Sequence, residues 1–143
     1  MQIKRDLIVN APVSKVWKTF SKLEKWTDYS GYIKKACWTS PEKWSLNSTF
    51  TQVIKIGILK RVSHPRIIKI KKCNYVTWTG TGSLVQGVHT LIFEKINNKK
   101  TKAVNTEYFK GILAPIIFPF IKNKFEEYFW QFLNGLKRES EKS

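Results

Sequence analysis

The last quarter of this chain carries a stripe of large apolar side chains at helical spacing. Its members recur every three or four residues and are Phe118, Ile121, Phe125, Phe129, Phe132 and Leu136. Pro115 and Pro119 suit the first turns of a helix better than its interior. We therefore expect a helix that begins between Leu113 and Pro119 and ends near Arg138. A helix of about 20 residues spans roughly 30 Å, so it needs a broad apolar surface to cover.

Short strand patterns fill most of the chain before this helix. Residues 2–9 alternate, and six further candidate strands follow at 32–39, 49–59, 61–71, 74–81, 84–96 and 101–111. The breaks between them fall at Pro41, Asn47–Ser48, Lys60, Lys72–Asn74, Gly82–Ser83 and Asn97–Asn98. The gap at Lys60 is so short that residues 49–71 form either two strands or one bent ribbon. Asn97–Asn98 predicts an exposed hairpin turn, because Asn tolerates positive φ.

Two short helical segments are expected between the first strand and the others. Residues 13–23 show an amphipathic pattern directly after Pro12, and residues 26–31 form a second helical turn or a loop. The chain is thus predicted to be one α+β domain over residues 1–143. A curved seven-stranded antiparallel sheet would wrap around the long C-terminal helix.

The order of motifs resembles the polyketide cyclase/dehydrase and lipid-transport superfamily, whose START-related members share a helix-grip fold. The resemblance rests on Ala11–Pro12, Val16–Trp17 and Trp26, on the stretch WTGTGSLVQGVHTLIFEKI, and on NTEYFKGILAPII before the last helix. It covers nearly the whole chain. It implies a cavity between sheet and helix in which family members bind lipids, hormones, quinone-like compounds or polyketides. Some members are enzymes, so the fold alone does not settle the function.

An apolar cavity would be lined by aromatic side chains from the strands and from the helical stripe. The candidates are Tyr29, Tyr32, Trp38, Phe50, Trp78, His89, Phe93, Phe109, Phe118, Ile121, Phe125 and Phe129. A stripe at helical spacing is more often core than ligand site, so we expect about half of these side chains to be ordinary core.

His89 and Glu107 are the weak catalytic candidates. His89 shares a strand face with apolar residues, which fits a core histidine bonded to a backbone carbonyl better than an acid or base. Glu107 either faces the cavity as a base or, as we expect in so basic a chain, pairs with a lysine. Two His and two Cys without metal-ligand spacing predict no metal site, and no cofactor motif is present.

The apolar run at residues 112–121 contains two prolines and is too short to span a bilayer. It is either a buried helix start or an exposed cavity entrance that contacts a membrane. The entrance candidates are Ile116, Ile117, Phe120, Lys122 and Lys124. Apolar side chains beside lysines suit a peripheral contact with anionic lipid.

The net charge of +16 fits an anionic membrane, a nucleic acid or simple solubility. Nucleic acid is disfavoured, because arginine is scarce, no nucleic-acid motif occurs and the lysines are scattered. Cys37 and Cys73 suggest no disulfide framework, which favours a cytoplasmic location. The leading hypothesis is noncatalytic binding or transport of a lipid or other hydrophobic small molecule. The alternative is a small cyclase/dehydrase-type enzyme that uses His89 and Glu107, and a nucleic-acid module ranks third. No oligomeric state follows from the sequence.

Overall fold

The computed structural model describes residues 1–80 and 84–142. In chain order the elements are β1 (Gln2–Val9), α1 (Val13–Phe20), the 3-10 helix η1 (Leu23–Lys25), α2 (Trp26–Tyr29), β2 (Ile33–Trp38), β3 (Phe50–Ile56), β4 (Leu59–Ser63), β5 (Arg66–Lys71), β6 (Tyr75–Thr79), β7 (Gln86–Asn97), β8 (Lys100–Lys110) and α3 (Ala114–Ser140). The α+β class, the first strand and the long last helix are confirmed. The predicted break at Gly82–Ser83 lies outside the described residues.

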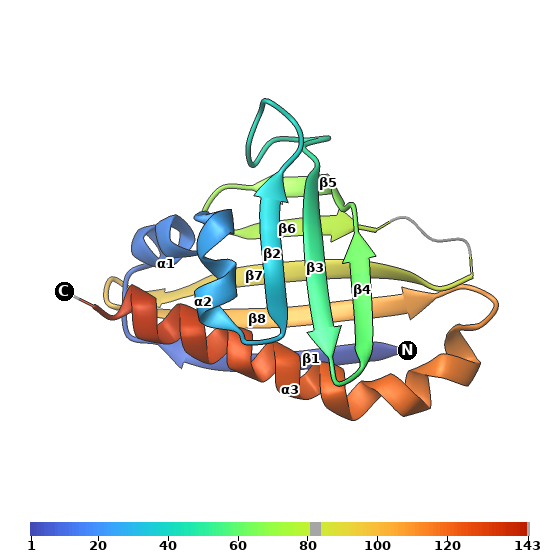
Figure 1. Cartoon of the computed structure of the whole chain (residues 1–143). Helices are drawn as coiled ribbons and strands as arrows, with labels where there is room; N and C mark the ends of the chain where they lie inside the picture. Colours follow the sequence, from blue (N-terminus) through green and yellow to red (C-terminus); the bar gives the residue numbers. More distant parts are fainter. Residues whose placement is uncertain (81–83, 143) are drawn as a thin grey trace.

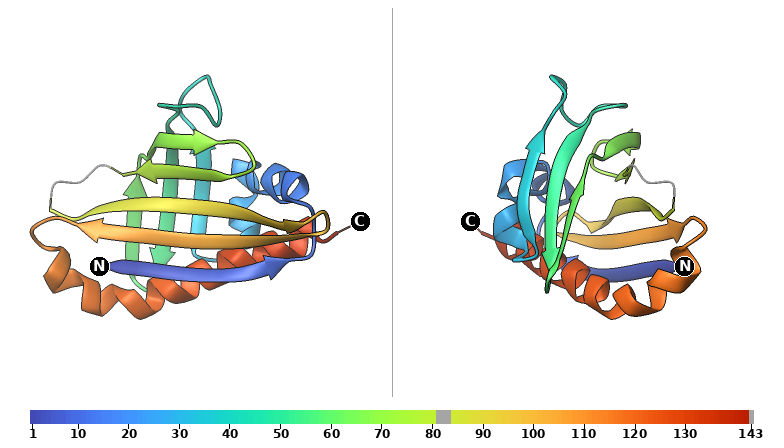
Figure 2. Two further views of the ribbon diagram at one scale, coloured as in Figure 1. Left: turned by 180° about the vertical axis from the view of Figure 1, so that it is seen from behind. Right: turned by 45° about the vertical axis from the view of Figure 1, so that its right-hand side comes forward.

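The strands form two antiparallel sheets rather than the one predicted. One sheet has the order β1-β8-β7-β6-β5, and the other has the order β2-β3-β4. The backbone links them where Phe50 N donates to Pro65 O at 3.1 Å and Ile67 N donates to Ser48 O at 2.9 Å. Figure 2 shows the smaller sheet leaning over the larger one, with α3 along the side where the two spread apart. Together they make the concave surface that the sequence predicted.

The prediction of seven strands is wrong, because residues 61–71 do not form one strand. The chain leaves β4 at Ser63 and re-enters the other sheet at Arg66, with Pro65 between them. Proline has no N–H to donate to a strand ladder, so the pairing of β4 with β3 ends here and the pairing of β5 with β6 begins. Within the described residues the strands therefore number eight.

The hairpin between β3 and β4 also differs from the prediction. Its turn lies at Gly57–Ile58 rather than at Lys60, so residues 49–71 are not one bent ribbon. Gly57 has a φ of 61°. Glycine with positive φ at the first position of a two-residue loop is typical of a type II′ turn, whose twist matches the strands that it joins.

The turn between β7 and β8 lies where the sequence predicted it, but a different interaction stabilises it. The Asn97 side chain accepts a hydrogen bond from the Lys99 backbone N–H at 2.8 Å. The non-glycine residues with positive φ in the described chain are Trp44, Asn47 and Cys73. The asparagine therefore contributes through its side-chain acceptor rather than through an unusual backbone conformation.

Helix α3 divides into two halves with different environments (Figure 1). It begins at Ala114 with Pro115 in its first turn and ends at Ser140, two residues past the predicted end. Its C-terminal half buries Phe129, Phe132, Leu133 and Leu136, whereas Phe120 in its N-terminal half is 80% exposed. Pro119 lies inside the helix rather than at its start. None of the helices in the described part of the chain is both long and apolar enough to cross a bilayer.

An aromatic cluster centred on Trp26 fills the end of the molecule opposite to the start of α3. The Trp26 ring lies 5.3–6.0 Å, centroid to centroid, from five rings of different elements, namely Phe20, Trp44, Phe50, Trp78 and Phe132. Its Nε1–H donates to the Phe20 carbonyl at 2.8 Å. Trp26 is fully buried, so this polar atom needs that partner.

Two phenylalanines of α3 test how the helix is held. Phe132→Ala should lower the free energy of unfolding by about 3–5 kcal/mol, because the side chain is buried against Trp26 and Tyr29. Phe120→Ala, on the same helix but exposed, should change it by at most about 0.5 kcal/mol. Urea unfolding followed by tryptophan fluorescence measures both. Equal losses would contradict the division of α3 into a buried and an exposed half.

Candidate functional site

A cavity of about 650 Å³ adjoins the core between the β3–β4 hairpin, β8 and the N-terminal half of α3. Its lining consists of Ile54, Ile56, Leu59, Lys60, Arg61, Val85, Phe109, Ile117, Phe120, Ile121, Lys124 and Phe125. Nine of these twelve are apolar and the other three are cationic. The inward positions of β3 alternate, as the buried Ile54 and Ile56 show, so the smaller sheet presents one apolar face to α3.

A second, much smaller pocket of about 30 Å³ adjoins the cavity. The two share Ile54, Arg61 and Phe125 in their linings. The small pocket adds polar groups, among them Gln52, His89, Glu107 and Tyr128. The site therefore combines a wide apolar chamber with a narrow polar end that is large enough for a water molecule.

His89 and Glu107 form an ion pair in this polar end. They are direct cross-strand partners on β7 and β8, and His89 Nδ1 lies 3.2 Å from Glu107 Oε1. The other ring nitrogen, Nε2, contacts Asn105 Oδ1. With the Asn105 amide oriented in this way, both ring nitrogens face acceptors. Side chains of β8 thus hold the imidazole through both of its ring nitrogens.

Two aromatic side chains pack against the His89 ring. Trp78 stacks on it with centroids 4.5 Å apart and an interplanar angle of 27°, and the Phe129 ring lies 4.9 Å away. The His89 and Glu107 side chains are only 10% and 9% exposed. These aromatic side chains exclude most water from the pair, so each polar atom depends on its protein partner.

Gly87 on β7 makes room for the Glu107 carboxylate. A Cβ at residue 87 would overlap Glu107 Oε2. Phe109 is the cross-strand partner of Gly87, so Glu107 reaches it diagonally across the two strands. The absence of a side chain at residue 87 therefore sets where the carboxylate lies.

Tyr128 adds a neutral hydroxyl to the polar end. It accepts a hydrogen bond from Gln52 Nε2 at 3.1 Å. Burial raises the pKa of the Tyr128 hydroxyl, and the nearby charge of Glu107 raises it further. The hydroxyl therefore keeps its proton at neutral pH. Within the described residues it donates no hydrogen bond, so that proton is free for a ligand.

The structure brings some of the predicted cavity residues together. Phe109, Ile121 and Phe125 line the chamber, as do three of the predicted entrance residues, Ile117, Phe120 and Lys124. Phe118 packs on Phe109 beside it, and Tyr32 packs on Tyr128. Trp78 and His89 line the polar end, with Phe129 behind His89. Ile116 and Lys122 are exposed outside the chamber lining.

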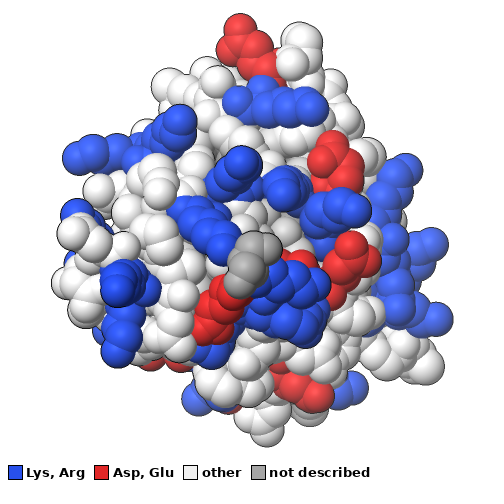
Figure 3. Space-filling view, turned by 90° about the vertical axis from the view of Figure 1, so that its left-hand side faces the viewer, with Lys and Arg blue, Asp and Glu red and all other residues white. Residues whose placement is uncertain are grey.

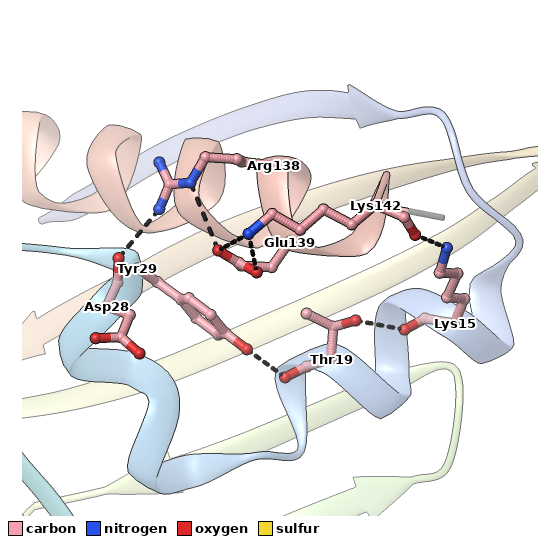
Figure 4. Close-up of polar contacts among 7 residues, drawn as sticks. All are labelled: Lys15, Thr19, Asp28, Tyr29, Arg138, Glu139 and Lys142. Carbon is pink, nitrogen blue, oxygen red and sulfur yellow. Dashed lines mark hydrogen bonds and ion pairs between the residues drawn. The ribbon is translucent and has the colours of Figure 1, made fainter.

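Four other predicted residues lie away from the chamber. Phe50 and Phe93 are buried in the aromatic cluster, and Trp38 packs on Phe50. The Tyr29 hydroxyl donates to the Thr19 carbonyl at 2.8 Å (Figure 4). Burial raises the pKa of the Tyr29 hydroxyl to about 12. Beside it, Arg138 donates to the Asp28 carbonyl and holds the end of α3 against α2. Tyr29 thus joins helices rather than lining a site.

The partners of the two catalytic candidates also differ from the predictions. Glu107 pairs with His89 and not with a lysine, and His89 is bonded to side chains and not to a backbone carbonyl. The hairpin residues that line the chamber, Arg61 among them, were absent from the predicted cavity residues. The alternation of Gln52, Ile54 and Ile56 was the available signal for the inward face of that hairpin.

A separate hollow of about 590 Å³ lies on the other side of the aromatic cluster, lined by Trp17, Trp44 and residues around Lys72–Cys73. It does not share a lining residue with the polar end. Among residues 1–80 and 84–142, no three His, Cys, Asp or Glu side chains come together as a metal site. We therefore assign the candidate site to the chamber with its polar end.

A matched pair of glycine variants tests the geometry of the polar end. Gly87→Ala should lower the free energy of unfolding by about 1–3 kcal/mol, because the new methyl group displaces the Glu107 carboxylate. Gly31→Ala, with no atom near the new Cβ, should be close to neutral. Combining Gly87→Ala with Glu107→Ala should remove most of the added cost in a double-mutant cycle. Strict additivity, measured by urea unfolding, would show that the two residues do not compete for space.

Comparisons with known proteins agree with this architecture. Residues 2–141 match the family described as polyketide cyclase/dehydrase and lipid transport. Among solved structures, the protein TTHA0849 from Thermus thermophilus has a TM-score of 0.82 at 14% identity, with 98% of this chain and 97% of that chain covered. The Zhui aromatase/cyclase from Streptomyces sp. R1128 has a TM-score of 0.80 at 11% identity, with 99% and 93% covered.

A START superfamily protein from Mycobacterium smegmatis has a TM-score of 0.79 at 12% identity, with 98% of this chain and 97% of that chain covered. At such identities the likeness shows the helix-grip fold and nothing finer. A search of curated protein sequences found no match. Because nearly the whole chain matches the family model, this chain belongs to the polyketide cyclase/dehydrase and lipid transport family.

Proposed function

We propose that this protein binds a lipid or another hydrophobic small molecule in the chamber under α3 and releases it unchanged. The observation that carries the proposal is the chamber itself, about 650 Å³ with nine apolar lining residues. Ligand sites in proteins are mostly apolar and fall in the range of about 300–1,000 Å³. Burying roughly 300 Å² of ligand surface contributes about 7 kcal/mol before the costs of ordering the ligand.

The state of His89 favours binding without catalysis. Both of its ring nitrogens are engaged, one by Glu107 and one by Asn105, and the rings of Trp78 and Phe129 pack against it. A general base needs a free nitrogen within reach of the substrate proton. The pair is better suited to holding β7 and β8 in register and to offering a polar surface to one end of a ligand.

A nucleic-acid partner has less support. On the face of the molecule shown in Figure 3, lysines and arginines are spread among acidic and uncharged side chains rather than gathered in one stripe. Recognition of nucleic acid usually relies on a continuous basic footprint. The excess of positive charge is better assigned to a contact with anionic lipid.

Filling the chamber should abolish binding. Ile121→Trp places an indole in the chamber and should weaken binding of the neutral dye Nile red at least tenfold. Ile116→Trp, on the same helix but outside the lining, should leave binding unchanged. Fluorescence titration measures both, and native mass spectrometry of wild-type protein should show a copurified hydrophobic ligand. Equal dye binding by the two variants would show that the dye binds outside the chamber.

Catalysis is the second candidate function, because an ion pair of His and Glu next to a substrate-sized chamber can act as acid and base. The copurified ligand distinguishes the two functions. A carrier returns it unchanged after incubation with fresh protein, whereas an enzyme converts it, and His89→Gln would stop that conversion. Mass spectrometry of the incubated ligand decides between them.

We further propose that the mouth of the chamber docks on anionic membranes. Exposed apolar residues flank it on two elements, with Ile58 98% exposed at the tip of the β3–β4 hairpin and Phe120 80% exposed on α3. Figure 1 shows this hairpin tip beside α3, and a Cβ at Gly57 would lie 3.7 Å from Lys124 Nζ. Residues 55–66 and 110–125 contain no acidic side chain. Apolar tips within a basic collar match the chemistry of an anionic lipid surface.

Vesicle flotation tests this docking. The double variant Ile58→Ser/Phe120→Ser should lose at least four-fifths of its binding to phosphatidylglycerol vesicles, because both insertable side chains are removed. Leu46→Ser is the control, since Leu46 is 60% exposed on the loop at the opposite end of β3. Binding should also fall with added salt and with neutral phosphatidylcholine. Equal binding to neutral vesicles would refute the electrostatic contact.

A further inference from the structure

Arg61 occupies the junction between the apolar chamber and the polar end. It lies on β4 directly opposite Ile54 of β3, and the two side chains share the inner face of the hairpin. Arg61 belongs to the linings of both the chamber and the small pocket. It is half-buried, so its guanidinium is partly removed from water while it faces the space in which a ligand would lie.

This guanidinium has no carboxylate partner within the described chain. The ion pairs present there join His89 to Glu107, Lys137 to Glu141, and Glu139 to Arg138 and Lys142. Glu107 lines the same small pocket as Arg61, but its Oε1 lies 3.2 Å from His89 Nδ1 and is paired there. Among the described residues, the Arg61 guanidinium is therefore a cation without an acidic partner at the edge of the chamber.

The remaining charged groups of the chamber have the same sign. Lys60 and Lys124 belong to its lining, which contains no acidic residue. Burial raises the pKa of the neighbouring Tyr128 hydroxyl, as does Glu107, whereas the charge of Arg61 acts in the opposite direction. Arg61 and the Tyr128 O–H thus form a pair of hydrogen-bond donors at the end of an apolar space.

We propose that the ligand is an amphipathic anion whose carboxylate or phosphate head pairs with Arg61 while its hydrocarbon part fills the chamber. A guanidinium offers two parallel N–H groups, which match the oxygens of either head group. A partly desolvated cation without a partner gains most from such a ligand, because the pair is screened less than at the surface. This inference rests on the proposed binding function and adds the class of ligand to it.

Three probes with the same alkyl chain test the assignment: dodecanoate, dodecyl phosphate and dodecanol. At least one anion should bind wild-type protein tenfold or more tightly than the alcohol, measured by displacement of Nile red. Arg61→Gln should reduce the affinity for that anion to the level of the alcohol and leave dodecanol binding unchanged. Arg61→Lys should retain part of the preference for the anion over the alcohol. Lysine keeps the positive charge but lacks the planar guanidinium with its two parallel N–H groups.

Arg66→Gln is the matched control. Arg66 is exposed on β5 outside the chamber lining, and its removal changes the net charge by the same amount. It should leave all three affinities unchanged. Unchanged dodecanol binding in Arg61→Gln shows that this variant is folded with an intact chamber.

The outcomes separate the class of ligand from the binding function itself. Equal affinity for anions and alcohol in wild-type protein would overturn the anionic ligand and leave hydrophobic binding standing. Equal losses of anion affinity in Arg61→Gln and Arg66→Gln would also overturn it, because the effect would then belong to net charge. No binding of any probe, with no copurified ligand, would overturn both proposals.

Discussion

The contact between Trp26 and its aromatic neighbours is the interaction on which the rest of the structure depends. One indole touches rings from α1, the loop before β3, both sheets and α3. It therefore closes the two sheets and the helix onto each other at one end of the molecule (Figure 1). The rings around Trp26 are closely packed, so that end of the interior between sheets and helix is filled by side chains. The chamber lies at the other end, where the smaller sheet and the N-terminal half of α3 diverge.

The same division explains the sequence of α3. Its apolar stripe runs over the whole helix, but the C-terminal half supplies core and the N-terminal half supplies the chamber. Periodicity shows which residues share a face and does not show what covers that face. Phe129 and Ile121 belong to the same apolar stripe. Phe129 nevertheless packs against the His89 ring, whereas Ile121 lines the chamber.

Sequence patterns predicted the elements that local rules determine. The first strand, the last helix and the β7–β8 turn depend on alternation, helical spacing and an asparagine, and all three are present. The pairing of β3 with β4 depends on where the chain turns, and the prediction placed the break at Lys60 although Gly57 is the residue that favours such a turn. With that turn misplaced, the residues of β4 that lie opposite the inward positions of β3 were not identified, so Arg61 was missed. Register decides which strand residues face a site, and it is a property of two segments together.

In the polar end, the pairing of His89 with Glu107 affects the electrostatic potential around a bound ligand. His89 and Glu107 lie opposite each other, and Gly87 leaves the space that the carboxylate occupies. Because the two side chains are bonded to each other, the Glu107 carboxylate is engaged within the protein. The sign of the potential in the chamber is then set by Arg61, Lys60 and Lys124, which are all positive. An apolar space with one positive end favours a ligand with the opposite polarity, a hydrocarbon body with an anionic head.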